Sequence, residues 1–452
     1  MAARFYDYLL LGNSAAAIAA VESIRAIDAD ASVCMVSPEA VPAYGRPLIS
    51  YLLEGKTTLE RMSLRPASFY GDNRVDTVFG QGGEAVALNP ETHTVTLSSG
   101  DVISYGKVLV ATGSIPFVPP IKGLMSRSNV STFLSLEQAQ TCAEAVGAAT
   151  AAAHACGRES RVVVVGGGLI GLKAAEALLP YVDHVVVLEM APRILPAVLD
   201  DAGAALLASA LEERGIVCMP GITASEFTGE GDSITAALLT DGSTLECDYV
   251  VAAVGVRPNA ALLEEAGAEM GRGVVVDETL RTSLPDVYAA GDVTQTTDLL
   301  DGSEKCLALW PNAVRQGRLA GAHMADDATA EMFEGNFAVN AVDFFDLSLL
   351  TSGIINPDPE AGYTETVTVE GDTYTKFVTK DDRLFGYILL NRPENAGIYT
   401  ALISRRVPLS SLSGDILTTT PRNLDFDEKI RWFRLHMGYP VGLDRNGWKE
   451  RA

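Results

Sequence analysis

The chain has 452 residues, of which 48% are hydrophobic and 20% are charged. This is ordinary globular usage over a length that suggests about three domains, so disorder is excluded as the main state. The formal net charge of −24 argues against nucleic-acid binding and against docking on anionic lipid, because an acidic surface repels phosphate groups. The chain has no run of about 20 apolar residues, so no membrane span is expected.

Six cysteines are scattered along the chain, at positions 34, 142, 156, 218, 247 and 306. None forms a C-x-x-C pair, and no cysteine–histidine group has the spacing of a zinc or iron–sulfur site, so no metal is expected. Scattered cysteines usually pack as small apolar residues, and we expect this of Cys34 in particular. The pattern favours a reducing compartment and predicts a cytoplasmic protein.

The first predicted unit is an apolar strand over 6–11, a turn at Gly12 and a helix of small residues that ends near Ile27. A second β-rich run over 32–36 completes a βαβ arrangement, which is typical of dinucleotide-binding folds.

The glycine pattern of this first unit is degenerate, because Ser14 and Ala17 stand where glycines are usual. Both residues are small enough to let a pyrophosphate approach the backbone. Ser37 stands at the strand end where an acidic residue would be expected to bind ribose. Its hydroxyl is one candidate for that contact, and Glu39 is the other.

A β-rich stretch over 85–110 follows and ends in the small-residue turn Ala111-Thr112-Gly113. Prolines at 116, 119 and 120 mark a boundary. Residues 143–156 are mostly alanine, which predicts a helix or a surface insertion.

The second unit carries a complete G-x-G-x-x-G motif, placed between a strand over 161–165 and a helix that runs to Leu179. Its glycines permit a tight turn, a close approach of pyrophosphate and close helix packing, and the N–H groups at the helix start favour phosphate. The predicted binding residues are Gly166, Gly168, Leu169, Ile170 and Gly171.

Glu189 follows the next predicted strand of this unit, 23 residues after Gly166. A carboxylate there accepts hydrogen bonds from ribose hydroxyls and repels a 2′-phosphate, which favours NADH over NADPH. Arg193 lies nearby and weakens that preference.

Past Gly255, which begins the run Gly255-Val256-Arg257-Pro258-Asn259, a second strand-end turn follows at Gly291-Asp292. A carboxylate after such a turn suits a polyol chain, as flavins carry. A helix is predicted over 312–325, preceded by Trp310. The chain beyond 334 has the pattern of a separate α+β domain, with helices near 394–405 and 427–437.

These motifs, in this order, resemble those of the FAD-dependent pyridine nucleotide-disulfide oxidoreductase superfamily. The run Tyr44-Gly45-Arg46-Pro47-Leu48-Ile49-Ser50 is similar to the branch of rubredoxin reductases, ferredoxin reductases and nitrite reductase flavoproteins. The resemblance implies an α/β fold with two Rossmann-like domains and an α+β C-terminal interface domain that often serves dimerisation. The implied domains are 1–118 with 249–330 for FAD, 119–248 for NAD(P)H, and 331–452 for the interface.

The resemblance also assigns roles to residues of the first unit. It implies that Arg46 and Pro47 lie against the flavin and that Asp292 binds the ribityl chain. Trp310 precedes the helix that returns to the flavin, so it is either a flavin contact or an interdomain core aromatic.

Departures from the superfamily pattern bear on the reaction. Disulfide-reducing relatives carry a C-x-x-x-x-C pair that this chain lacks, and peroxide-type relatives carry a cysteine where we align Tyr44 and a histidine where we align Ala15. Thiol-based catalysis therefore has no nucleophile here.

Lys173 is the third departure, because relatives usually have a glutamate at this position near the nicotinamide. Its ammonium is expected either to stabilise the reduced flavin and raise its potential, or to be a solvated lysine on a helix.

The resulting hypothesis is an NADH:acceptor oxidoreductase whose flavin reduces a small redox protein such as rubredoxin, or a partner redox subunit. A relatively basic segment from residue 401 onward, with nine Lys/Arg and six Asp/Glu, is a candidate docking site for that carrier, although it could equally dock the chain's own acidic body. The alternatives are an oxidase, a reductase of a small organic acceptor, and a non-catalytic flavin subunit.

Overall fold

A computed structural model describes residues 4–415, 417, 419, 422 and 425 of the chain. The helix predicted over 427–437 and most of the relatively basic segment from 401 onward lie outside these residues. Within the described residues, no helix combines the length and apolar character needed to cross a membrane.

The first unit is built around a mixed sheet with the order β3-β2-β1-β6-β5-β4, and β18 pairs with β6. Its strands run β1 (Arg4–Leu11), β2 (Val33–Ser37), β3 (Val75–Phe79), β4 (Ala85–Asn89), β5 (Thr94–Leu97), β6 (Val102–Val110) and β18 (Val287–Ala289). The central strands β1, β2, β3, β6 and β18 pair in parallel, as the βαβ pattern predicted.

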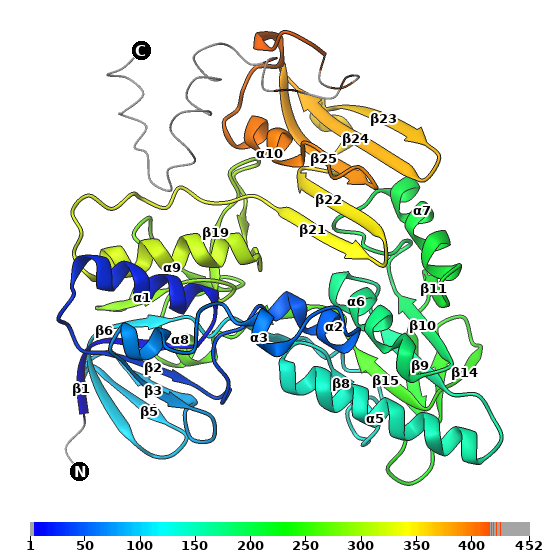
Figure 1. Ribbon diagram of the computed structural model, residues 1–452, viewed down its shortest axis with the longest axis horizontal. Helices are drawn as coiled ribbons and strands as arrows, with labels where there is room; N and C mark the ends of the chain where they lie inside the picture. The colour runs from blue at the N-terminus through cyan, green and yellow to red at the C-terminus, as the bar shows by residue number, and fades with distance from the viewer. Residues whose placement is uncertain (1–3, 416, 418, 420–421, 423–424, 426–452) are drawn as a thin grey trace.

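Helices α1 (Ala15–Ile27) and α9 (Trp310–Met324) lie side by side on this unit (Figure 1). Glycines in α9 allow the close approach, because a Cβ at Gly317 would lie 2.0 Å from the Ala16 carbonyl oxygen. The predicted helix over 312–325 is thus confirmed, with its start two residues earlier.

The second unit has a parallel sheet with the order β11-β10-β9-β15-β8. Its strands are β8 (Val130–Thr132), β9 (Arg161–Val165), β10 (His184–Glu189), β11 (Ile216–Pro220) and β15 (Tyr249–Ala252), and its helices are α5 (Leu136–Ala155), α6 (Leu169–Leu178) and α7 (Asp201–Glu212). The alanine-rich stretch 143–156 begins in the first half of α5 and forms the whole of its second half. Strand β15 belongs to this sheet because it pairs with β9 and β8, so the expected boundary before residue 249 cuts through the second unit.

Two short strands, β7 (Ser114–Pro116) and β16 (Val256–Pro258), pair where the chain crosses between the two units. The second unit also carries a small antiparallel sheet of β12 (Ala224–Thr228), β13 (Ala236–Leu239) and β14 (Thr244–Glu246). The remaining short elements are α2 (Ile49–Leu53), α3 (Leu59–Met62), α4 (Phe69–Asp72), α8 (Ala261–Glu265), β17 (Val274–Val275), β19 (Thr294–Thr297), β20 (Glu304–Lys305) and the 3-10 turns at 46–48, 179–181, 359–361 and 409–411.

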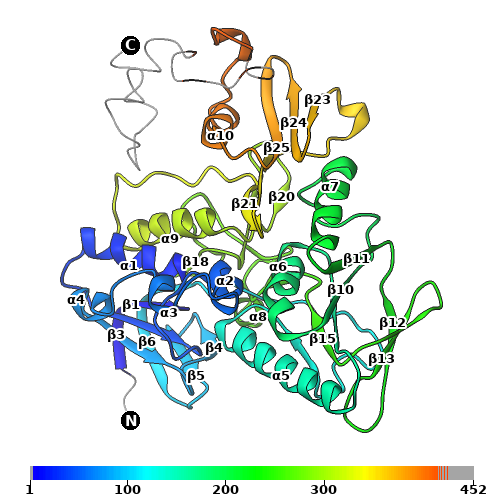
Figure 2. The same cartoon turned by 45° about the vertical axis from the view of Figure 1, so that its right-hand side comes forward.

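The third part is an antiparallel sheet with the order β21-β22-β25-β24-β23 and one helix. It consists of β21 (Val339–Phe344), β22 (Leu347–Gly353), β23 (Thr364–Glu370), β24 (Thr373–Lys380), β25 (Arg383–Leu390) and α10 (Ala396–Ser404). Both views place this sheet beside α7 of the second unit (Figures 1 and 2). Residues of β21, β22, β24 and β25 share one apolar core with the second unit, so the α+β part is packed on it.

Candidate functional site

All three parts of the chain meet at one large cavity of about 1860 Å³. A drug-sized ligand occupies a pocket of about 300–1,000 Å³, so this cavity has room for more than one such molecule. All predicted site residues except Ala17 and Gly171 line it; these are Gly12, Ser14, Ser37, Arg46, Pro47, Ala111, Thr112, Gly113, Gly166, Gly168, Leu169, Ile170, Lys173, Glu189, Gly255, Gly291, Asp292 and Trp310.

The turn of the first unit leaves the start of α1 open to the cavity. Gly12 has a φ of +123°, and a Cβ there would lie 2.2 Å from the Ala111 carbonyl oxygen, so the two turns touch. Ser14 is the N-cap residue of α1 and makes no side-chain capping bond, which leaves the first N–H groups of a 13-residue helix free for an anion. Ala17 is fully buried and packs the helix instead.

A polar group follows at the end of β2. Ser37 is buried, and its Oγ accepts a hydrogen bond from the Glu39 amide. Glu39 forms an ion pair with Arg46 and accepts a 2.6 Å hydrogen bond from the Tyr44 hydroxyl. Tyr44 lies outside the cavity lining, and burial raises the pKa of its hydroxyl to about 12. The first unit therefore presents the Glu39–Arg46 pair to the cavity, while Tyr44 supports it from behind.

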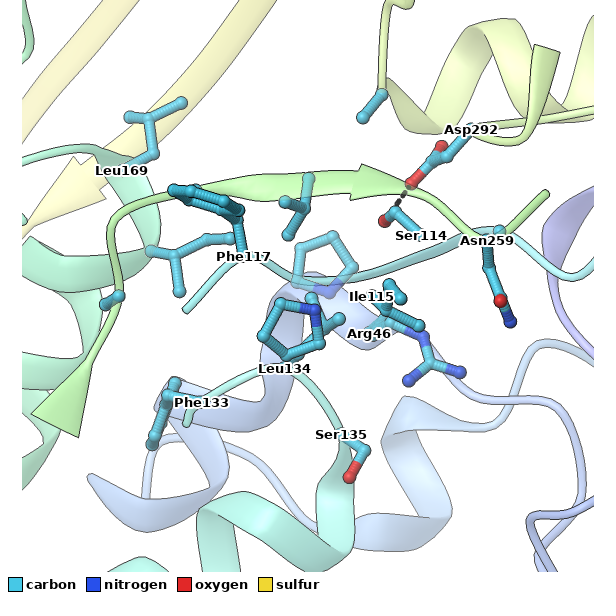
Figure 3. A pocket seen from close by; sticks show the side chains of 18 of the residues that line it. Arg46, Ser114, Ile115, Phe117, Phe133, Leu134, Ser135, Leu169, Asn259 and Asp292 are labelled. Carbon is cyan, nitrogen blue, oxygen red and sulfur yellow. Dashed lines mark hydrogen bonds between the residues drawn. The ribbon is translucent and has the colours of Figure 1, made fainter. Parts of the chain in front are cut away.

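Asp292 provides a partly buried carboxylate to the cavity lining, next to Ser114 (Figure 3). The Ser114 hydroxyl donates to its Oδ2 at 2.9 Å. Burial raises the pKa of Asp292, although the bond from Ser114 and the charge of Arg46 oppose this effect. Gly291 is held in place by a 2.6 Å hydrogen bond from its amide to the Gln316 side chain. A carboxylate at the cavity lining suits a ligand that donates hydroxyl hydrogen bonds.

The turn of the second unit also precedes a helix, and here all three positions of the motif are glycine. Gly166 has a φ of +113°, and a Cβ there would lie 2.4 Å from the Ala253 carbonyl oxygen. Gly168 is the N-cap of α6 and has no atom within 4 Å of the space that a Cβ would occupy. Gly171 packs helix against strand, since a Cβ there would lie 1.9 Å from the Gly166 carbonyl oxygen. These features fit a pyrophosphate against the backbone at Gly168.

Glu189 stands beside this turn at the end of β10. Its two carboxylate oxygens accept hydrogen bonds from the amides of Gly167 and Ala191, both at 2.7 Å. Arg193 points to a different partner, because its guanidinium bonds the Leu199 carbonyl and Asp201. The acid therefore lines the cavity, while the arginine is engaged elsewhere.

Lys173 lies on α6 and is buried, with 8% of its surface exposed, so the expectation of a solvated lysine is wrong. Its Nζ is 2.5 Å from Glu176 Oε2 and 3.4 Å from Glu54 Oε1, and it donates a 3.1 Å hydrogen bond to the Asp343 carbonyl. The ammonium also lies 4.3 Å from the centre of the Tyr51 ring.

Among the described residues, no cysteine lines the cavity. Cys34 is buried as expected, and burial raises its pKa to about 12. Burial likewise raises the pKa of Cys142, Cys218, Cys247 and Cys306, and Cys156 is exposed on the C-cap of α5. The raised pKa values of the five cysteines other than Cys156 are typical of unreactive thiols. No group of three or more His, Cys, Asp or Glu residues within the described chain has a metal-binding arrangement.

Several lining residues were missed from the sequence. They are Tyr51, the apolar residues Ile115, Phe117, Phe133 and Leu134 around the crossing between the units, and residues 339–343 of the C-terminal part. Figure 3 shows Phe117 on the side of Leu169, and Arg46 nearer to Ile115 and Asn259. No motif marks these residues; the one signal was the proline cluster next to Phe117. Trp310 lines the cavity and packs against the core of the first unit. Its contact with a flavin stays a prediction.

Comparisons with known proteins agree with this geometry. The family model of pyridine nucleotide-disulphide oxidoreductases matches residues 6–317. The epsilon subunit of NADH-dependent phenylglyoxylate dehydrogenase from Aromatoleum evansii is 29% identical over 418 residues, which cover 90% of this chain and 93% of the relative. Putidaredoxin reductase CamA from Pseudomonas putida is 26% identical over 425 residues, which cover 90% and 94%. The solved NAD-dependent persulfide reductase from A. fulgidus has a TM-score of 0.80 at 25% identity, over 90% of this chain and 78% of that chain.

Proposed function

Because the chain belongs to the pyridine nucleotide-disulphide oxidoreductase family, whose members are NAD(P)H-dependent flavin oxidoreductases, we propose that it passes electrons from NADH through FAD to a separate redox protein. The observation that carries this proposal is the shared cavity, which brings two dinucleotide-type turns together without a thiol in its lining. When bound, NADH supplies a hydride, and FAD accepts it and can release its electrons singly.

The first turn is the proposed FAD site. The free N–H groups at the start of α1 would hold its pyrophosphate, and the Glu39–Arg46 pair, which follows β2, would hold its adenosine half. Asp292 accepts hydrogen bonds from the ribityl hydroxyls. Pro47 and Trp310 provide apolar contact for the ring system.

The second turn is the proposed NADH site. Gly168 lets the pyrophosphate approach the start of α6, and Glu189 accepts hydrogen bonds from the adenosine ribose. A 2′-phosphate at that position would meet the Glu189 carboxylate, and the nearby Arg193 is bound to Asp201 instead. The preference for NADH over NADPH follows from this pairing.

Direct delivery from the flavin to the acceptor follows from the positions of the cysteines. A thiol relay requires a thiolate within reach of the flavin, and the described cavity lining contains none. The histidine of peroxide-type relatives is also replaced by Ala15, which lines the cavity. The flavin itself must therefore meet the acceptor.

The proposed acceptor is a small redox protein or a redox subunit of a larger enzyme. The two curated relatives described above are named as a subunit of an NADH-dependent dehydrogenase and as a reductase of putidaredoxin. Oxygen and small organic acceptors are the competing choices, and a non-catalytic flavin subunit is the third.

Anaerobic stopped-flow absorbance tests the proposal. We expect the purified yellow protein to bleach on mixing with NADH, more slowly with NADPH, and to recover its colour with rubredoxin or ferredoxin-type carriers. Recovery with air alone would favour an oxidase, and a flavin that NADH leaves oxidised would favour the non-catalytic subunit. Protein alkylated on its exposed Cys156 should behave as the untreated protein; inactivation by alkylation, or a covalent adduct trapped on a cysteine during turnover, would contradict direct delivery.

A further inference from the structure

We propose that Lys173, Glu54, Glu176 and Lys56 form a charge-balanced ion cluster that sets the redox potential of the flavin. This inference rests on the proposed function, because it concerns a flavin bound in the cavity. It differs from the simple expectation that Lys173 presents an unpaired positive charge.

The charges of the cluster differ in their position relative to the cavity. Lys173 lines the cavity, whereas neither Glu54 nor Glu176 does. The two carboxylates are almost fully buried, with 7% and 2% of their side chains exposed, and both lie within 3.4 Å of the Lys173 ammonium. The positive charge of Lys173 therefore lies at the cavity wall, and the two negative charges lie outside the lining.

Lys56 completes the charge balance from the solvent side. Its Nζ lies 2.5 Å from Glu54 and 3.2 Å from Glu176, and 44% of its side chain is exposed. Two ammonium groups and two carboxylates give a net charge of zero. Tyr51 lines the cavity, and both ammonium groups lie near its ring. That of Lys173 is 4.3 Å and that of Lys56 is 5.6 Å from the ring centre.

The cluster joins all three parts of the chain. Glu54 is the C-cap residue of α2 in the first unit, and Lys173 and Glu176 lie on α6 in the second. The C-terminal part closes the cluster, because the Asp343 carbonyl accepts from Lys173 and the Phe345 amide donates to Glu176 at 2.8 Å. The buried members are thus held in fixed positions, which a constant field at the cavity wall requires.

Changing one charge in this cluster must change the potential in a predictable direction. Reduction of a bound flavin adds negative charge, so an uncompensated anion nearby makes reduction harder and an uncompensated cation makes it easier. Burial keeps water from screening the difference. Neutralising Lys173 leaves the cluster at −1, and neutralising Glu54 leaves it at +1.

The experiment measures flavin midpoint potentials of holoprotein variants by equilibration with redox dyes. Lys173→Met should shift the potential to a more negative value, Glu54→Gln should shift it to a more positive value, and the double variant should lie close to the wild type. Lys56→Met is the matched control: it removes a cation bonded to the same carboxylates but outside the cavity lining, so its negative shift should be smaller than that of Lys173→Met.

Shifts of the same sign in Lys173→Met and Glu54→Gln, or no shift in either, would overturn the cluster while wild-type bleaching by NADH still supports the proposed function. If Lys173→Met loses its flavin, Glu54→Gln and Glu176→Gln decide the matter, because both must shift the potential to a more positive value. A wild-type protein that NADH does not bleach would overturn the proposed function itself.

Discussion

Glu189 combines two tasks that a single carboxylate can perform at once. Its oxygens accept hydrogen bonds from the amides of Gly167 and Ala191, which fixes the shape of the second turn, and they also face the cavity. Each carboxylate oxygen has two lone pairs, so acceptors remain for a ribose. The carboxylate thus supports the turn, and in the proposed function the same oxygens would discriminate between NADH and NADPH.

Replacing Glu189 should alter the choice of nicotinamide nucleotide. Glu189→Ala removes the repulsion of a 2′-phosphate, and we expect the ratio of kcat/KM for NADPH over NADH to rise about tenfold, which corresponds to ~1.4 kcal/mol. Stopped-flow bleaching rates at several concentrations of each nucleotide measure this ratio. The control is Glu159→Ala, an exposed carboxylate that pairs with His184 away from the cavity, and it should leave the ratio unchanged. An unchanged ratio in Glu189→Ala would assign discrimination to another residue.

At the scale of single elements, the two glycines at the start of α6 differ in the space around their Cβ positions. Gly168 has open space around its Cβ position and a φ of −80°, which any residue adopts. Gly171 has no such space, because the Gly166 carbonyl oxygen lies 1.9 Å from its Cβ position. The fold therefore requires glycine at position 171 but not at 168, where we propose that a bound pyrophosphate requires it.

Two alanine substitutions should therefore fail in different ways. Gly168→Ala should change the free energy of unfolding by no more than about 0.5 kcal/mol, as at other open sites, while weakening NADH binding at least about tenfold. Gly171→Ala should lower the free energy of unfolding by about 1–3 kcal/mol through overpacking. Urea unfolding and nucleotide titration measure the two effects. Equal loss of stability in both variants would mean that Gly168 is structural as well.

The elements that sequence predicts well are those whose cause is local. The strand, turn and helix around Gly166 follow from a run of valines, three glycines and small residues within about 20 positions, and the helix of alanine-rich residues 143–156 follows from propensity. The degenerate first turn at Gly12 also forms as predicted, because Ser14 is small enough to serve as the N-cap.

What the sequence could not supply is contact between distant segments. Lys173 was expected either to act at the flavin or to be solvated, and its burial depends on Glu54, 119 positions earlier, and on Asp343, 170 positions later. Tyr51 and residues 339–343 reach the cavity for the same reason, since tertiary packing and not periodicity brings them there. Tyr51 lines the cavity, whereas Tyr44, where we aligned the cysteine of peroxide-type relatives, lies outside the lining.

At the scale of the whole molecule, the C-terminal sheet has to stay docked if it is to close the cavity. One polar contact that docks it is formed by Asp200, the N-cap residue of α7, which accepts hydrogen bonds from the Gly203 amide at 3.0 Å and the Tyr374 hydroxyl at 2.5 Å. The Lys376 ammonium, which is buried in β24, lies 3.0 Å from the same carboxylate. Burial alone would raise the pKa of Asp200, but these partners outweigh it and hold the pKa below its usual 3.8.

Asp200→Asn should loosen this contact and destabilise the protein in a pH-dependent way. We expect the free energy of unfolding at pH 7 to fall by about 2 kcal/mol, the usual worth of hydrogen bonds to a charged group. Because the folded-state pKa is lowered, the difference from the wild type should be complete above about pH 5 and shrink as the pH falls through the unfolded-state pKa toward the folded-state pKa. Urea unfolding at pH 7, 5 and 3 measures it. Asp201→Asn is the matched control, since that neighbouring carboxylate is 90% exposed and pairs with Arg193 at the surface, and it should have little effect at any of these values. A difference that grows on acidification would contradict an ionised Asp200 in the folded protein.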